Sequence, residues 1–192
     1  ATIILGPAPA SVQMGGRVAP LPTIFCNINA ALGGYQGRAE PERRLQGWLE
    51  SAAPGQACVL WGLGGSGKST LARTFAARLA GGAEAGSLRL VFQLSASAID
   101  QDYVKLLSVL MQELPDARGG APVVDVSALK PEEVRGRVHA MLRSADWRGK
   151  WLCVLDDLPP PFKQTMKEAG LDWLIGDFPW AHGRAIITTR AA

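Results

Sequence analysis

Residues 62–70 read GLGGSGKST, a run in which glycines precede one lysine and two hydroxyl side chains. The run fits the spacing G-x-x-x-x-G-K-[ST] from Gly62 through Gly67, Lys68 and Ser69. Glycines let successive backbone N–H groups point into one concavity, and a following helix adds the positive end of its dipole. Such a loop is suited to hold phosphate. The expected contacts are Gly62, Gly64, Gly65, Ser66, Gly67, Lys68, Ser69 and Thr70.

A glycine-rich run could also form a flexible linker, and its neighbours decide between the two readings. The preceding segment QACVLWG (56–62) is typical of a buried parallel strand. After the run, Leu71, Phe75 and Leu79 recur every four residues, which predicts a helix. We therefore expect a phosphate-binding loop between a strand and a helix. Lys68 would reach the terminal phosphates and Ser69 would ligate Mg²⁺, while Thr70 would contact the inner phosphates.

Two adjacent acids end another apolar run, WLCVLDD (151–157). The carboxyl ends of the strands in a parallel sheet are the edge where ligands bind. We expect Asp156 to hold Mg²⁺, either through water or together with Ser69, and Asp157 to orient the water that attacks the terminal phosphate. Two acids after a strand can also form a solvated turn that caps a helix. The phosphate-binding loop upstream favours the catalytic reading.

The segment AIITTR (185–190) predicts a further buried strand, which ends in Thr188, Thr189 and Arg190. A guanidinium at this edge can pair with a terminal phosphate oxygen and so distinguish ATP from ADP. The alternative is an ordinary surface arginine. We expect Arg190 to belong to the site.

Helix-like segments alternate with these strands, which predicts a parallel sheet wrapped by helices. The expected strands are 56–62, 88–94, 151–157 and 185–189, and the expected helices begin near Pro41, after the glycine run, near Tyr103 and at Pro131. Residues 1–34 lack helical periodicity, and we interpret them as an N-terminal segment or linker with a short strand or hairpin.

Composition narrows the class of protein. The chain has 192 residues, 47% hydrophobic and 19% charged, with a net charge of +3. Lysine and arginine are scattered, so we do not expect a nucleic-acid partner. No apolar run approaches the roughly 20 residues of a membrane span, and three widely spaced cysteines suit a reducing compartment. We expect a cytoplasmic protein.

His139 and His182 lie among polar neighbours, and we assign neither a catalytic role.

These components, in this order, resemble the NB-ARC branch of the STAND ATPases. The family includes plant disease-resistance proteins, animal apoptosome ATPases and bacterial regulators. GLGGSGKSTLA resembles its phosphate-binding loop, LRLVFQLSAS its second strand, KWLCVLDDL its Walker B strand and GRAIITTR its sensor strand. The resemblance implies a sensor role for Arg190. It also implies functions in signal transduction and defence, with ATP or ADP and Mg²⁺ bound.

The upstream segment YQGR (35–38) resembles the family element that covers the adenine and ribose. The resemblance implies backbone contacts from Gly37 and Arg38. The family usually has an acid directly after the arginine, whereas Ala39 stands there and the acids lie at Glu40 and Glu42. We therefore carry over no acidic role. The resemblance implies a nucleotide-binding domain over residues 35–192 that is incomplete at its C-terminus.

The fold that the resemblance implies is a P-loop NTPase three-layer α/β/α sandwich with strand order 5-1-4-3-2. The chain stops just after Arg190, so we expect the fifth strand to be missing. The edge of the strand at residues 56–62 is then expected to be unpaired or filled by the N-terminal segment. The same order places residues 185–189 between Cys58 and Cys153, which argues against a disulfide joining them.

Two functions fit these residues, and a third option is a degenerate structural relic, although none of the expected nucleotide contacts is substituted. The favoured one is a regulatory switch in which ADP holds an inactive form and ATP favours assembly with other copies of the full-length protein, while slow hydrolysis resets the switch. The alternative is an ATPase enzyme whose turnover or product is the function. A GTPase would need an Asn-Lys-x-Asp motif, which this sequence lacks. A kinase would need an arginine-rich lid, and residues 159–184 offer only Lys163, Lys167 and Arg184.

Overall fold

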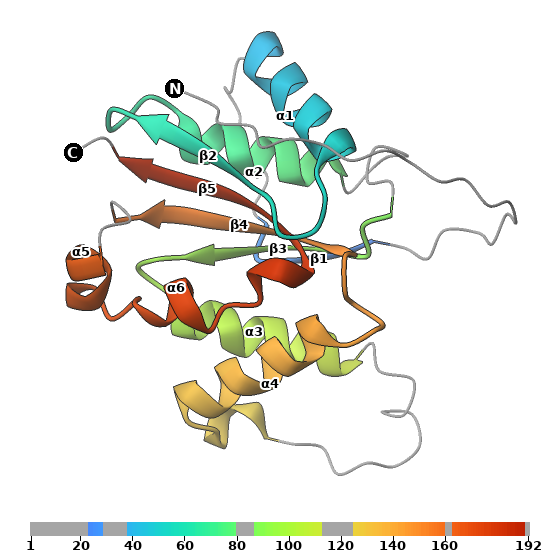
Figure 1. Ribbon diagram of the computed structural model, residues 1–192. Helices are drawn as coiled ribbons and strands as arrows, with labels where there is room; N and C mark the ends of the chain where they lie inside the picture. The colour runs from blue at the N-terminus through green and yellow to red at the C-terminus, as the bar shows by residue number, and fades with distance from the viewer. Residues whose placement is uncertain (1–22, 29–37, 80–86, 113–124, 160–162, 191–192) are drawn as a thin grey trace, which may run out of the picture.

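A computed structural model describes residues 23–28, 38–79, 87–112, 125–159 and 163–190. Its centre is a five-stranded sheet in which every neighbouring pair is parallel (Figure 1). The order across the sheet is β1-β3-β4-β5-β2. The strands are β1 (Ile24–Cys26), β2 (Ala57–Gly62), β3 (Leu90–Ser95), β4 (Trp151–Leu158) and β5 (Arg184–Arg190).

The central strands form because their apolar runs can be buried on both faces of the sheet. Every residue of β4 from Trp151 to Asp156 is buried, as are the first five residues of β3. Parallel registers follow, with Ser95 opposite Asp156 and Gly62 opposite Arg190. All the strands therefore end at one edge, the left-hand side of Figure 1.

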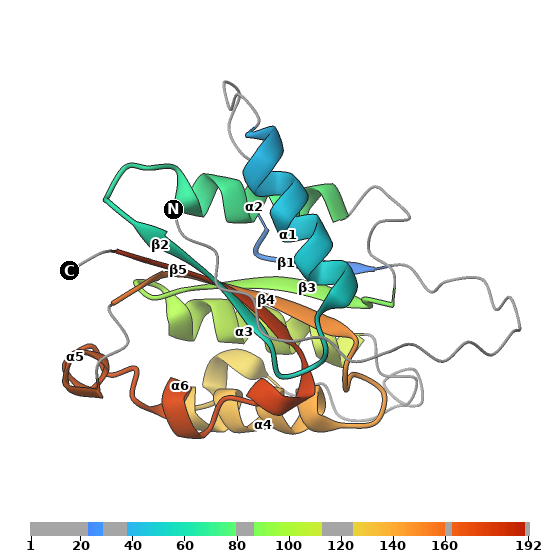
Figure 2. The same ribbon diagram turned by 45° about the horizontal axis from the view of Figure 1, so that its top comes forward.

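Helices cover both faces of the sheet, giving three layers. In Figures 1 and 2 one pair of helices lies over one face and a second pair over the other, and two short helices lie near the carboxyl edge. The first pair is α1 (Ala39–Ser51) and α2 (Lys68–Arg78); the second is α3 (Ile99–Gln112) and α4 (Pro131–Arg143); the short ones are α5 (Lys163–Glu168) and α6 (Trp173–Gly176). Two 3-10 turns span Val126–Ala128 and Trp180–His182. No helix in the described part of the chain is long and apolar enough to cross a membrane.

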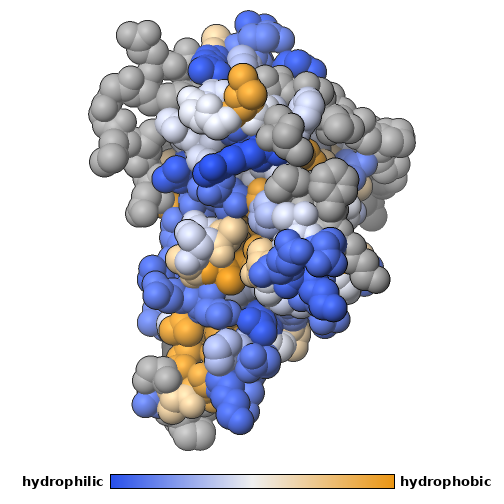
Figure 3. All heavy atoms as spheres, turned by 90° about the vertical axis from the view of Figure 1, so that its left-hand side faces the viewer, coloured by the Kyte–Doolittle hydropathy of each residue, from blue (hydrophilic) through white to orange (hydrophobic). Residues whose placement is uncertain are grey.

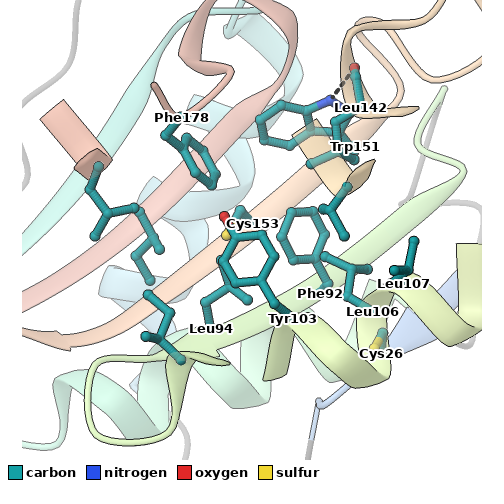
Figure 4. Close-up of a cluster of buried hydrophobic side chains, with 14 of the residues drawn as sticks. Cys26, Phe92, Leu94, Tyr103, Leu106, Leu107, Leu142, Trp151, Cys153 and Phe178 are labelled. Atoms are coloured by element: carbon teal, nitrogen blue, oxygen red, sulfur yellow. Dashed lines mark hydrogen bonds between the residues drawn. The ribbon is translucent and has the colours of Figure 1, made fainter. Parts of the chain in front are cut away.

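Two hydrophobic layers hold the helices to the sheet. Beneath α1 and α2, Leu45, Trp48 and Phe75 pack on Cys58 and Leu60 of β2. The layer beneath α3 and α4 is richer in aromatic rings, as Figure 4 shows around Trp151. The indole N–H of Trp151 donates a hydrogen bond of 3.2 Å to the carbonyl oxygen of Leu142, so this buried polar group is satisfied.

The aromatic layer also contains His139, which corrects the expectation of polar surroundings. Its ring is only 5% exposed and contacts the rings of Tyr103, Trp173 and Phe178. The Tyr103 hydroxyl and His139 Nε2 are 2.8 Å apart. Burial, aided by the nearby guanidinium of Arg143, lowers the pKa of His139 to about 4. The histidine is therefore a neutral core residue at neutral pH.

The expected fold is confirmed, with one correction at the edges. The strands predicted at 56–62, 88–94, 151–157 and 185–189 are β2, β3, β4 and β5, and they follow the expected order. The N-terminal strand β1, however, pairs with β3 at the opposite edge from β2. Among the described residues β2 pairs with β5 alone. Strand β5 does lie between Cys58 and Cys153, and both cysteines are free.

Candidate functional site

The glycine run forms the connection between β2 and α2. Gly65 and Gly67 have φ angles of +74° and +81°, a left-handed conformation that glycine adopts without a steric penalty. Helix α2 begins directly after Gly67, with no acid in its first turn and no side chain capping it. Its N-terminal amides are thus left for a ligand, and an anion is the partner that the helix dipole favours.

Lys68 is folded back into this loop. Its side chain is buried, and the ammonium donates hydrogen bonds to the carbonyl oxygens of Gly62 (2.8 Å) and Leu63 (2.7 Å). The Ser66 hydroxyl lies 3.3 Å away. The hydroxyls of Ser69 and Thr70 make no hydrogen bond to any other described residue. The loop therefore concentrates one positive charge and two hydroxyls beside the helix N-terminus.

Asp156 ends the buried part of β4 and faces the α2 side of the sheet. Its Oδ1 accepts a hydrogen bond of 2.7 Å from the hydroxyl of Thr188 on β5. Its Oδ2 lies 3.8 Å from Nη2 of Arg73, a residue of α2. The second oxygen is thus turned toward the helix that carries Ser69.

Asp157 leaves the regular sheet. The register between β4 and β5 shifts between Leu155 and Leu158, and Asp157 has a φ of +55° in this irregular stretch. The guanidinium of Arg190 donates two hydrogen bonds to the Asp157 carboxylate, from Nε to Oδ1 (3.1 Å) and from Nη2 to Oδ2 (3.2 Å). Arg190 is also opposite Gly62, where the phosphate-binding loop starts.

Arg38 lies beside the same loop. A Cβ placed on Gly67 would be 3.7 Å from Nη2 of Arg38, so this guanidinium is close to the N-terminus of α2. Gly37 lies outside the described residues. The predicted site residues that the structure describes therefore lie along one edge of the sheet, with Arg38 beside the N-terminus of α2.

Residues 35–174 match the family model described as AAA ATPase domain. The match covers well over half of the chain. The chain belongs to the AAA ATPase domain family. A search of curated proteins found no match.

Membership of the AAA ATPase domain family, which lies within the P-loop NTPases, implies nucleotide binding, typically with Mg²⁺. The described residues fit such a ligand. Left-handed glycines and an uncapped helix N-terminus suit phosphate, while Mg²⁺ prefers oxygen ligands such as the Ser69 hydroxyl and the Asp156 carboxylate. Groups of the kind that bind phosphate and oxygen atoms of the kind that ligate Mg²⁺ thus lie at one edge of the sheet in this AAA ATPase domain.

Sequence reasoning assigned no role to two residues that organise this AAA ATPase domain. Arg73 donates from Nε to the carbonyl oxygen of Ser69 (3.2 Å) and reaches toward Asp156, so it connects α2 with β4. Its spacing of four residues from Ser69 puts the two on one helix face, which could have indicated it. Thr188 hydrogen-bonds to both acids of β4. Its position two residues after Ile186 indicates the face of β5 on which it lies, but not these two bonds.

The carboxyl edge of the AAA ATPase domain is hollowed beside the Asp157–Arg190 pair. An open hollow of about 440 Å³ is lined by both residues together with Ala96, Ser97, Leu158, Pro159, Ala169 and Leu171. Figure 3 views this edge and shows hydrophilic and apolar residues lying side by side across it. The two residues predicted to act on the terminal phosphate are thus accessible from solvent.

The end of β3 is fixed by a buried carboxylate. Asp102 of α3 accepts a hydrogen bond of 2.8 Å at Oδ2 from the backbone N–H of Ser95. Burial raises the pKa of the Asp102 carboxyl, and this hydrogen bond opposes the increase. Because Ser95 is opposite Asp156, the contact helps to hold the strand next to the acids.

Proposed function

We propose that this chain is the ADP- and ATP-binding switch of a signal-transduction ATPase of the NB-ARC and STAND type, reset by slow Mg²⁺-dependent hydrolysis. The observation that supports it best is the pairing of Asp157 with Arg190. These are the two residues expected to act on the attacking water and the terminal phosphate. Assembly with other copies of the full-length protein on activation is part of the same proposal.

The roles of the other residues follow from their positions. Lys68 and the backbone of residues 62–67 hold the phosphates, and Arg38, beside Gly67, contacts the nucleotide. Ser69 and Asp156 hold Mg²⁺. The metal, when bound, neutralises charge on the phosphate oxygens. Thr188 and Arg73 flank the Asp156 carboxylate and restrict its orientation.

Competition for Arg190 gives the site its two states. A guanidinium prefers a planar, bidentate anionic acceptor, and Asp157 supplies one. A γ-phosphate offers a more highly charged acceptor. It would lie near the start of the phosphate-binding loop, where Arg190 is opposite Gly62. Pairing of Arg190 with that phosphate releases Asp157 to orient water. ADP has no γ-phosphate, so Arg190 keeps its pairing with Asp157.

The ion pair is weak enough for a nucleotide to break. The side chains of Arg190 and Asp157 are 66% and 56% exposed. Exposed pairs of this kind are worth about 0.2–1 kcal/mol. A charge-assisted contact to phosphate is worth about 1.5–3 kcal/mol, so the γ-phosphate wins the competition.

Nucleotide preference tests the proposal. The measurement is displacement of a fluorescent mant-ADP probe by ADP or by the non-hydrolysable ATP analogue AMPPNP, in the presence of Mg²⁺. It gives the affinities of wild type, Arg190→Ala and Asp157→Ala for both nucleotides. Arg190→Ala should lower the preference for AMPPNP over ADP by about tenfold or more. Asp157→Ala should raise it, by up to about fivefold, because Arg190 is no longer held. Arg148→Ala and Asp146→Ala make the same charge changes at the opposite end of the sheet and serve as controls.

Opposite shifts in the two variants support the switch, and a fall in both contradicts it. Sedimentation velocity, together with the turnover rate, distinguishes the switch from the remaining alternative. If the proposal holds, the full-length protein should associate when AMPPNP is bound and not when ADP is bound, and its turnover should be slow. Rapid turnover without any nucleotide-dependent association would favour an ATPase enzyme whose turnover or product is the function.

A further inference from the structure

We propose that Thr188 is a positioning residue whose single hydroxyl orients both acids of β4 and thereby sets the affinity of the site for Mg²⁺. This inference rests on the proposed function for the role of Asp156. It goes further by assigning a role to a residue that contacts neither phosphate nor metal.

The hydroxyl of Thr188 accepts one hydrogen bond and donates another. It accepts the backbone N–H of Asp157 at 2.8 Å and lies 2.7 Å from Oδ1 of Asp156. An amide N–H can only donate, so the hydroxyl proton is left to go to the Asp156 carboxylate. Thr188 is 1% exposed, which keeps water from competing for either bond.

This bridge stands where the sheet ladder is broken. Leu155 is opposite Ile187, whereas the next recorded pair is Leu158 with Thr189. Within that irregular stretch the Asp157 amide donates to the Thr188 side chain. The bond therefore stabilises the left-handed backbone of Asp157 (φ +55°), a conformation that is unfavourable for a residue other than glycine.

Both acids depend on that geometry. With Oδ1 of Asp156 held by Thr188, Oδ2 is turned toward α2, where Arg73 and Ser69 lie. With its backbone held, Asp157 presents its carboxylate to Arg190. Loss of the hydroxyl frees the Asp156 side chain to rotate, so a metal ligand must be ordered again each time Mg²⁺ binds.

Thr189 provides a matched control within the same strand. It is also buried, with 4% exposed, but its hydroxyl is without a hydrogen-bond partner in the part of the chain that the structure describes. Alternation along β5 places it on the opposite face from Thr188. Thr189→Val therefore removes a buried hydroxyl from β5 without touching the bridge.

The test compares wild type with Thr188→Val, Thr188→Ser and Thr189→Val by two measurements. Amide hydrogen exchange at Asp157, followed by NMR without nucleotide, should accelerate by about tenfold in Thr188→Val and remain slow in the other two. The Mg²⁺ concentration that half-saturates the metal-dependent part of mant-ADP binding should rise by about tenfold in Thr188→Val. Binding in EDTA should be unchanged. Thr188→Ser keeps the hydroxyl and should restore the wild-type values.

Unchanged Mg²⁺ dependence in Thr188→Val would overturn the inference, and so would equal effects in Thr189→Val or a failure of Thr188→Ser to restore the wild-type values. If Thr188→Val does not fold because its added methyl group lies against the Asp156 carboxylate, Thr188→Ala makes the same comparison without an apolar group at that position. Failure of both to fold, beside a folded Thr189→Val, would assign the hydroxyl to the fold alone and overturn the positioning role. If wild type binds no mant-ADP at all, the proposed function fails and the metal part of this inference fails with it.

Discussion

Arg190 and Asp157, on neighbouring strands, form a two-point ion pair at the carboxyl edge of the sheet, with contacts of 3.1 and 3.2 Å. Asp156, the residue before Asp157, is buried and bonded to Thr188 instead. Two adjacent acids therefore have different environments. Asp156 is fixed in the sheet, which suits its proposed role as a metal ligand, and Asp157 is exposed and can exchange partners.

Asp157→Ala should slow ATP hydrolysis by about a hundredfold or more, because the residue that orients the attacking water is lost. ATP binding should be nearly intact, since Asp156 keeps its contact with Thr188. Phosphate release and equilibrium binding, measured on the same samples, check this. Asp146→Ala, in an exposed turn before β4, is the control. A parallel loss of binding and turnover would show that Asp157 supports nucleotide binding.

Lys68→Ala should weaken the binding of ATP more than the binding of ADP, because the ammonium is expected to neutralise the terminal phosphates. The loss is expected to be about 1.5–3 kcal/mol, or roughly tenfold or more in affinity for ATP. The melting temperature should also fall slightly, since the carbonyl groups of Gly62 and Leu63 lose their donor. Calorimetry with each nucleotide checks this, with Lys150→Ala as a charge-matched control. Unchanged ATP affinity would remove the assignment of the phosphate-binding loop.

The sequence predicted the central strands and the residues at their ends. Apolar runs such as WLCVLDD are long enough to identify a buried strand, and in a parallel sheet the residue after each run must reach the same edge. From the sequence alone, Asp156, Arg190 and the glycine loop are therefore expected at one edge of the sheet, and this expectation does not depend on the detailed register.

The features that were missed depend on register. The bridge by Thr188 and the pairing of Asp157 with Arg190 arise from the irregular stretch between β4 and β5, which no local pattern indicates. The three residues of β1 are too few to show a periodicity that would select an edge. His139 was misjudged because its sequence neighbours do not reveal that Tyr103 of α3, Trp173 of α6 and Phe178 surround it with aromatic rings.

Gly183→Ala should destabilise the fold by about 1–3 kcal/mol or more, because a Cβ there would overlap the indole ring of Trp151. That ring is fully buried between Phe92 and Phe178 and cannot move aside cheaply. Gly136→Ala is the control. It lies within α4 with no atom near its Cβ position and should stabilise by about 0.5–1 kcal/mol. Urea denaturation of both variants checks that their free energies of unfolding change in opposite directions. Equal changes would contradict the clash between the Cβ at position 183 and Trp151.

All three cysteines should resist thiol reagents in the native state. Each is buried and free, and burial raises the pKa of Cys26 and Cys58 to about 11. At about pH 8 only roughly one such thiol in a thousand is the reactive thiolate. Ellman's reagent should label three thiols at once in guanidinium and almost none before unfolding. Immediate labelling of one native cysteine would contradict its buried position.

His139 should make the protein less stable as the pH falls. Its pKa is lowered to about 4 in the folded state, first by burial and then by Arg143, with Arg135 adding to the effect and Asp177 opposing it. The unfolded chain has a histidine pKa near the usual value of about 6.5, so it binds the proton more tightly. Stability from this residue is therefore constant above about pH 7.5 and declines between about pH 6.5 and 4, by on the order of 3 kcal/mol in total.

Urea denaturation of wild type and His139→Gln between about pH 7.5 and 4.5 checks this expectation. The carboxyl groups titrate in both proteins, so the difference between the two curves isolates the histidine. The variant should be less stable near neutral pH, where the packing of the ring is lost, and its stability should change less as the pH falls. Tyr103→Phe removes the hydroxyl partner and keeps the ring buried, so most of the wild-type pH dependence should remain. Parallel curves for wild type and His139→Gln would show that His139 titrates normally in the folded protein.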